Sequence, residues 1–107
     1  MKIDFWQLSR DPVDKVTALI AQRVLDQGER LLVVSADKEQ RAAISKGLWK
    51  SAPESFLANG EASEPGADRQ PILLSEDTQA TNGASHAIFA DGTFRDAPAF
   101  GRTFLLF

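Results

Sequence analysis

The stretch Leu48-Trp49-Lys50-Ser51-Ala52-Pro53-Glu54-Ser55-Phe56-Leu57 joins the end of a predicted helix to an extended segment. Two large aromatic residues, Trp49 and Phe56, stand on either side of Pro53, a residue that stops helices. Each ring buries about 150–250 Å² when it is fully covered, so a turn that only had to be soluble would need neither. The two rings therefore either fill the core where the chain leaves the helix, or face a partner protein.

The chain before this stretch begins with a strand and a helix. Residues 3–8 read as a strand, because aromatic and branched side chains favour a pleated surface. Asp11 can cap the following helix and Pro12 suits its first position. Apolar residues then recur at spacings of three and four from Val13 onward, and Gly28 is expected to end the helix in a left-handed cap.

A second strand and helix follow at once. Residues 31–34 form an unbroken apolar run, which is typical of a strand covered on both faces. Ser35 or Asp37 can cap the next helix, and Asp37 with Gln40 has the spacing of a capping box. This helix is expected to end near Trp49, and the order strand-helix-strand-helix predicts right-handed crossovers and a parallel sheet.

The chain after the stretch is thinner in regular structure. Residues 59–70 are polar and rich in turn signals, and we expect a loop there. Three further strands are predicted at residues 71–74, 87–90 and 103–107. We therefore predict a single α/β domain over residues 1–107, with three layers and a mostly parallel sheet of about five strands. The topology is mononucleotide-binding-like (Rossmann-like), without a nucleotide site.

Composition and charge exclude several classes of protein. The 107 residues carry a formal net charge of −3 and include no cysteine, which rules out disulfides, thiolate zinc sites and a cysteine nucleophile. Lys and Arg are spread among acids, which argues against extensive direct binding to duplex DNA. No apolar run approaches the ~20 residues that span a bilayer, and Asp4 interrupts any secretory signal. We expect a cytoplasmic protein.

No group of residues forms a recognisable active site. The turn at residues 9–12 has none of the glycines that let backbone amides cradle a phosphate. His86 is the only histidine, and a structural role is expected for it. Asp37 and Glu39 follow the end of a strand, where α/β ligand sites lie, but acids there also complement a helix N-terminus. We predict no catalytic residue, no cofactor and no bound metal.

Leu48-Trp49 together with Pro53-Glu54-Ser55-Phe56-Leu57 resembles the chi subunit of bacterial DNA polymerase III. The resemblance also includes four other stretches, which are Phe5-Trp6-Gln7-Leu8, residues 31–34, Asp37-Lys38-Glu39-Gln40 and Pro71-Ile72. The family usually continues its Ser-Phe with a small apolar residue and Pro-His, whereas this chain has Leu57-Ala58-Asn59. The family also continues past the last strand into a C-terminal helix, so the resemblance is to a shortened member that lacks this helix.

The resemblance implies a non-catalytic adaptor on the clamp-loader side of the DNA polymerase III holoenzyme. Chi subunits bind the psi subunit, which links them to the clamp loader, and the acidic C-terminal tail of the single-stranded-DNA-binding protein. Their contact with DNA is indirect. The residues that match the psi-facing surface are Leu48, Trp49, Pro53, Phe56 and Leu57. The candidates for tail binding are Arg95 and Arg102, because the family's tail-binding residues lie largely in the C-terminal part that is missing here.

Two alternative functions stay open. A small α/β enzyme or phospho-receiver would need an acidic pocket at the strand ends, for which the chain offers only four acids, Asp37, Glu39, Glu76 and Asp77. Convergence of Asp37 and Glu76 on one pocket would favour this alternative. A shortened paralogue of unrelated role would fold without binding either replication partner.

Overall fold

Strands and helices alternate along the first half of the chain, and short strands dominate the second half. The computed structural model describes residues 2–8, 12–51, 59–95 and 100–107. In chain order its elements are β1 (Lys2–Trp6), α1 (Val13–Asp26), β2 (Leu31–Val34), α2 (Lys38–Ser51), β3 (Asn59–Glu61), the 3₁₀ helix η1 (Ala67–Arg69), β4 (Ile72–Ser75), β5 (His86–Phe89) and β6 (Arg102–Leu106).

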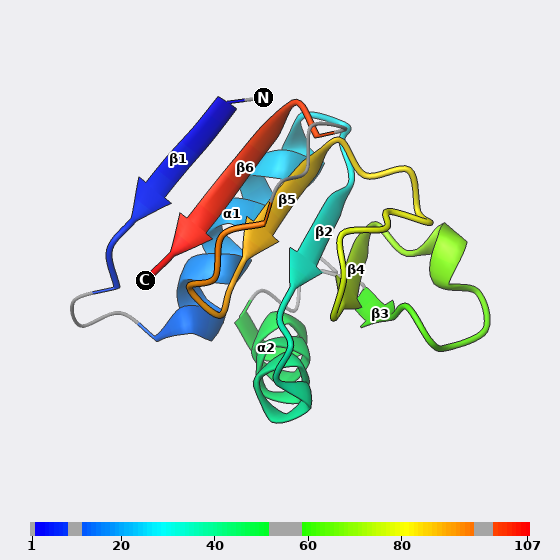
Figure 1. The fold of residues 1–107 in the computed structure, drawn as a ribbon. Helices are drawn as coiled ribbons and strands as arrows, with labels where there is room; N and C mark the ends of the chain where they lie inside the picture. The colour runs from blue at the N-terminus through cyan, green and yellow to red at the C-terminus, as the bar shows by residue number, and fades with distance from the viewer. Residues whose placement is uncertain (1, 9–11, 52–58, 96–99) are drawn as a thin grey trace.

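Within the described residues, six strands form one sheet in the order β1-β6-β5-β2-β4-β3 (Figure 1). Every neighbouring pair is parallel, and β2 lies near the middle, where Leu31 pairs with Ile72 on one side and with His86 on the other. The predicted parallel α/β fold is confirmed. Each predicted strand is present: β2 has the predicted limits, and the limits of the others are shifted by a residue or two. The sheet has one strand more than expected.

The extra strand is β3, which lies in a segment predicted to be a loop. Its sequence, Asn59-Gly60-Glu61, has no apolar or branched residue that would signal a strand. Backbone pairing with β4 and side-chain contacts with α2 hold it at the edge of the sheet. Ser45 donates a hydrogen bond to the buried Asn59 side chain, and the Arg41 guanidinium lies 3.1 Å from the Glu61 carboxylate. Tertiary contacts therefore make this strand, and local propensity does not.

The direction of each crossover explains what covers each face of the sheet. From β1 to β2 and from β2 to β3 the chain moves one way across the sheet, and both connections are α-helices. From β3 to β6 it moves back, and in the described residues these connections contain η1 and no α-helix. Parallel crossovers share one hand, so reversing the direction puts the connections on the opposite face. Helices thus form one outer layer, and η1 with loops forms the other.

The two faces of β2 show this division. Leu31 and Val33 belong to a core shared with α1 and α2, while Leu32 and Val34 belong to a second core on the other face. All four side chains are fully buried, which is what the unbroken apolar run predicts. The helix-side core also contains Ile20, Ile44, Leu48, Ile72, Leu74, Ile88, Phe104 and Leu106. The opposite core also contains Ala67, Leu73, Ala87, Phe89, Phe100 and Leu105.

Helix α1 confirms the predicted apolar stripe and C-terminal cap. Val16, Ile20 and Val24 are buried, and Gly28 takes a positive φ of 76° just after the helix. Pro12, however, lies one position before the helix, with an extended ψ of 142°, and not at its first residue. The proposed Asp11 cap lies outside the described residues.

Helix α2 begins differently from the predicted capping box. Asp37 does cap the helix, because its Oδ1 accepts a 2.9 Å hydrogen bond from the Glu39 backbone N–H. The Gln40 side chain does not reach back to Asp37. Instead it donates to the Ala90 carbonyl at 3.1 Å and accepts a hydrogen bond from the Ser35 hydroxyl. Gln40 therefore joins the start of α2 to the end of β5, a long-range contact that sequence spacing cannot reveal.

Candidate partner-binding site

Trp49 projects from the last part of α2 into solvent, with 53% of its surface exposed. Helical geometry turns each residue about 100° from the one before it, so Trp49 leaves the buried face on which its neighbour Leu48 lies. The indole is therefore available to a partner, and it is among the large apolar side chains that the described residues leave in water. The other expected members of this surface, Pro53, Phe56 and Leu57, lie outside the described residues.

Leu48 belongs to the core and not to the surface. Its exposed fraction is 0%, and it packs in the cluster that joins both helices to the sheet. The side chain is covered within the chain itself, so this burial does not favour the predicted contact of Leu48 with the psi-like subunit, which stays a prediction. Leu48 fixes α2 on the sheet and thereby orients Trp49 outward.

The solvent face of α2 around Trp49 is basic. Lys46 precedes Trp49 by one helical turn and Lys50 follows it directly, and both are exposed. Ala42, two turns before Trp49, is also exposed and leaves the indole accessible along the helix. An aromatic anchor flanked by cations suits a partner helix that carries an apolar stripe with acidic neighbours.

Arg95 is held by an acid close to it in sequence. Its two guanidinium NH groups donate to the two carboxylate oxygens of Asp91 at 2.9 and 2.7 Å, and the guanidinium lies 5.8 Å from the Phe89 ring centre. Burial alone would raise the pKa of Asp91, but hydrogen bonds from Arg95 and from the backbone of Ala36 and Thr93 lower it to about 2. Arg95 thus closes the turn after β5.

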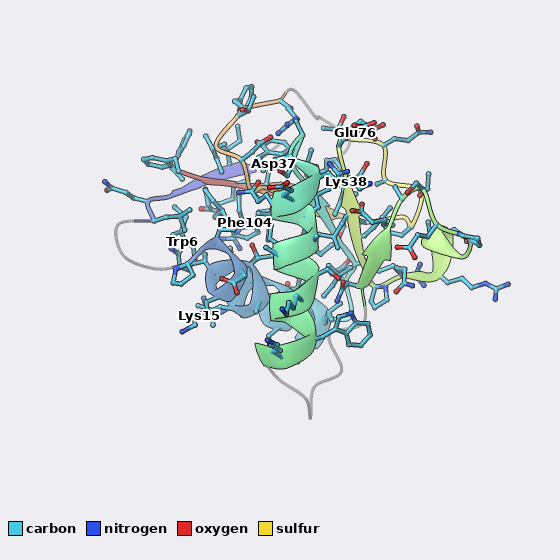
Figure 2. The ribbon with its side chains drawn as sticks, turned by 90° about the horizontal axis from the view of Figure 1, so that it is seen from below. Trp6, Lys15, Asp37, Lys38, Glu76 and Phe104 are labelled. Carbon is cyan, nitrogen blue, oxygen red and sulfur yellow. The ribbon has the colours of Figure 1, made fainter. Side chains whose placement is uncertain are left out.

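Arg102 is paired with an acid from the other end of the chain. Its Nε donates to Asp4 at 2.6 Å, and the guanidinium stacks 5.1 Å from the Phe104 ring centre. Arg102 also lines a cavity of about 350 Å³ between α1 and the sheet, together with Arg23, Ile20, Val24 and Trp6 among others. Figure 2 shows Trp6 and Phe104 on the α1 side of the sheet.

The two arginines do not form one site. Asp91 and Arg95 follow the carboxyl end of β5, whereas Arg102 begins β6. These two strands are parallel, so the arginines lie at opposite ends of the sheet. A single basic rim built from Arg95 and Arg102 is therefore excluded by the topology.

Comparison with protein families decides the assignment. The family model of the DNA polymerase III chi subunit, HolC, matches residues 1–107, which is the whole chain. The chain belongs to this family. A search of curated proteins found no match. Membership supports an accessory role in DNA replication as part of DNA polymerase III, and none of the described helices is long and apolar enough to cross a membrane.

The acids of this chi-family chain are used mainly to hold its turns and helix ends. A polar depression of about 470 Å³ does form near the carboxyl ends of the strands, and Lys38, Glu61, Glu76 and Asp77 help to line it. Figure 2 shows Asp37, Lys38 and Glu76 toward the same end of α2, but Asp37 is not among the lining residues. Its carboxylate caps the helix instead.

Two of the three acids that line the depression, Glu61 and Asp77, have structural partners, and the third, Glu76, is exposed. Glu61 pairs with Arg41, and Asp77 accepts hydrogen bonds from the Ser75 hydroxyl at 3.2 Å and the Gln79 backbone at 3.0 Å. The described residues contain no group of three or more acids or histidines suited to a metal ion. Of the two acids whose convergence would favour a phospho-receiver or acid-pocket enzyme, Glu76 lines the depression and Asp37 does not.

His86 lies beside the hydroxyl of Ser85, the residue before it in the chain, and nothing in the sequence indicated that this contact would form. The Ser85 hydroxyl donates to Glu29 at 2.7 Å and lies 2.8 Å from Nδ1 of His86. The Ser85 hydroxyl thus joins Glu29, which precedes β2, to His86 at the start of β5, and the trio ties these two segments together.

We predict that neither nucleotides nor divalent metal ions stabilise the protein. The sequence of the first turn, residues 9–12, has no glycine that would suit a phosphate cradle. Near the strand ends, Glu61 is engaged by Arg41, Asp77 by Ser75, and Asp37 by a backbone amide. Thermal-shift titrations with ATP, GTP, Mg²⁺, Mn²⁺ and Zn²⁺ should show no saturable rise in melting temperature. A saturable rise with any one of them would contradict this prediction, and its loss in Glu76→Gln would place the binding site in the depression that Glu76 lines.

Proposed function

We propose that the protein is a non-catalytic adaptor of the bacterial DNA polymerase III holoenzyme, working in the cytoplasm on its clamp-loader side. It binds a psi-like clamp-loader subunit as its main partner and the single-stranded-DNA-binding protein as a weaker one. Its contact with DNA is indirect. The observation that carries the proposal is the exposed Trp49 on a helix whose opposite face is locked into the core.

The psi-like partner is proposed to dock on α2 and the segment that follows it. Trp49 is the anchor, and Lys46 and Lys50 supply positive charge beside it. Pro53, Phe56 and Leu57, which lie outside the described residues, are included because they match the family's psi-facing residues. An exposed Trp is a common anchor of a binding hot spot. Isothermal titration of the purified protein with the psi subunit of the same organism tests the proposal. Absence of heat and of co-elution at micromolar concentrations would overturn it.

Binding to the acidic tail of the single-stranded-DNA-binding protein is expected to be weak, with a Kd above about 100 µM. Such a tail needs a basic rim around an apolar pocket, and both candidate arginines are already paired with carboxylates. Arg102 is the better candidate, because Arg23 and the apolar side chains of Ile20 and Val24 line the same cavity.

Fluorescence anisotropy with a labelled tail peptide measures this affinity. Arg102→Glu should abolish the residual binding, and Arg95→Glu, at the far end of the sheet, serves as the matched control that should leave it unchanged. A Kd in the low micromolar range for the wild type, or equal loss in both variants, would contradict the prediction.

A further inference from the structure

Strand β1 forms one edge of the sheet, and its outer side is open. It pairs with β6, and no strand of the described residues lies on its other side (Figure 1). Lys2 donates to Gly101, Trp6 accepts from Phe107, and Leu8 donates to Phe107. The even-numbered residues of this segment therefore bond inward to β6. In a regular strand, the backbone groups of Ile3, Phe5 and Gln7 then point outward, away from β6.

The two edges of the sheet differ in how they resist pairing with another strand. At the far edge, β3 has only three residues and carries Glu61 in an ion pair with Arg41. β1 has five residues and contains neither proline nor a bulge in its register with β6. Its one acid, Asp4, is compensated by Arg102 at 2.6 Å. Lys2, exposed at the first residue of β1, is the one device of this kind on the strand, which lacks the proline, the bulge and the short length that also block edge-to-edge pairing.

The outer part of β1 also presents an exposed aromatic ring. Phe5 is 67% exposed, the largest value among the exposed large apolar residues of the described chain. Asp4, Phe5 and Trp6 all help to line the cavity on the helix side of the sheet, and Trp6 packs against the helix-side core. Because side chains alternate along a strand, the Phe5 side chain leaves β1 toward the other face. Phe107, which hydrogen-bonds to the backbone of Trp6 and Leu8, is 56% exposed and follows Leu105 on that face.

We propose that β1 pairs antiparallel with β1 of a second copy of this chain, so that two sheets join into one across a twofold axis at Phe5. In this register Phe5 lies opposite Phe5 of the second copy, and Ile3 lies opposite Gln7. All three outward-facing residues then form hydrogen-bonded pairs, and no backbone group between residues 3 and 7 is left open. The two phenyl rings meet on the face opposite the helices.

The charges of β1 select this register over its neighbour. Moving the axis to Asp4 would also pair outward-facing residues, but it would bring the two Asp4 carboxylates into a close cross-strand pair, which is unfavourable. With the axis at Phe5, Asp4 instead lies opposite Trp6 of the second copy and keeps Arg102 as its partner. The twofold axis thus lies at Phe5, because two Phe5 rings pack favourably against each other whereas two Asp4 carboxylates would repel.

The expected dimer is reversible. One strand edge and one ring from each copy make an interface smaller than those of stable complexes, so we expect dissociation in the range of tens to hundreds of micromolar. Sedimentation equilibrium of the purified protein from about 5 to about 500 µM should show a monomer that becomes a dimer as concentration rises. A protein that stays monomeric at the highest concentration would overturn the proposal.

Two variants test the geometry. Ile3→Pro removes an N–H that points outward and leaves the bonds to β6 in place, so the fold should survive while dimerisation weakens about tenfold or more. Phe5→Glu places two carboxylates opposite each other and should have a similar effect. Circular dichroism checks that each variant is folded. If one variant fails to fold, the other still tests whether β1 forms the dimer contact.

Trp49→Ala is the matched control, because it removes another exposed aromatic residue from a different element and should leave the dimer unchanged. Dimerisation that persists in both β1 variants, or that Trp49→Ala abolishes, would place the contact elsewhere and overturn the proposal. Phe5→Glu should bind the psi subunit as the wild type does, because the proposed psi site lies on α2. Titration of this variant with the psi subunit therefore tests the adaptor function separately from dimerisation.

Discussion

Replacing Trp49 with alanine should weaken binding of the psi-like partner by about 30-fold or more, a loss of about 2 kcal/mol. The indole is 53% exposed, and truncation removes an anchor that a partner would cover completely. The same change should lower the free energy of unfolding by less than about 1.5 kcal/mol, since the ring contributes little to the core. Isothermal titration and urea unfolding of the same variant measure the two effects.

Exposed charges beside Trp49 provide the control for this prediction. Lys50→Gln changes a neighbouring exposed side chain and should reduce affinity only modestly, because a charge at the rim of an interface acts chiefly on the association rate. If Trp49→Ala bound the psi-like partner as tightly as the wild type, the site on α2 would be excluded. A stability loss of about 3–5 kcal/mol would instead show that the ring is buried in solution.

The parts of the fold that follow from burial could be predicted from the sequence. The apolar run at residues 31–34 is covered on both faces, as such a run requires, and Gly28 ends α1 with a positive φ. The edge strand β3 could not be predicted, because Asn59 and Gly60 have low strand propensity. Contacts with Ser45 and Arg41, both distant in sequence, hold it in place.

In the candidate site, the sequence predicts the exposure of a side chain only where helix geometry determines the direction in which that side chain points. The turn of about 100° between consecutive residues separates Trp49 from Leu48, and the structure has the first exposed and the second buried. The partners of the two arginines depend on the tertiary fold. Arg102 meets Asp4, which is 98 residues away in sequence, and this pairing exists only because β1 and β6 are neighbours in the sheet. Nothing in the local sequence of Arg102 indicates it.

Replacing Leu48 with alanine should lower the free energy of unfolding by about 3–5 kcal/mol, toward the upper end of such truncations. Leu48 is completely buried among the residues that join α1, α2 and the sheet. The cost of a cavity falls when neighbouring elements move in to fill it. Here α2 has little room to move toward α1, because a Cβ placed on Gly47 would lie 2.6 Å from Oδ2 and 2.7 Å from Cβ of Asp14. The two helices are already in close contact beside the cavity.

Urea unfolding of Leu48→Ala measures this loss, and Leu19→Ala is the control. Leu19 is a leucine in the neighbouring helix that is 46% exposed, so its truncation should cost well under half as much. Binding of the psi-like partner to folded Leu48→Ala, measured at low temperature, should weaken less than binding to Trp49→Ala, because Leu48 is buried in the core and Trp49 is exposed. A stability loss below about 1.5 kcal/mol combined with a loss of affinity as large as that of Trp49→Ala would return Leu48 to the interface. The two adjacent residues therefore separate the two roles of α2, because truncating Leu48 tests how the helix is held and truncating Trp49 tests what it presents.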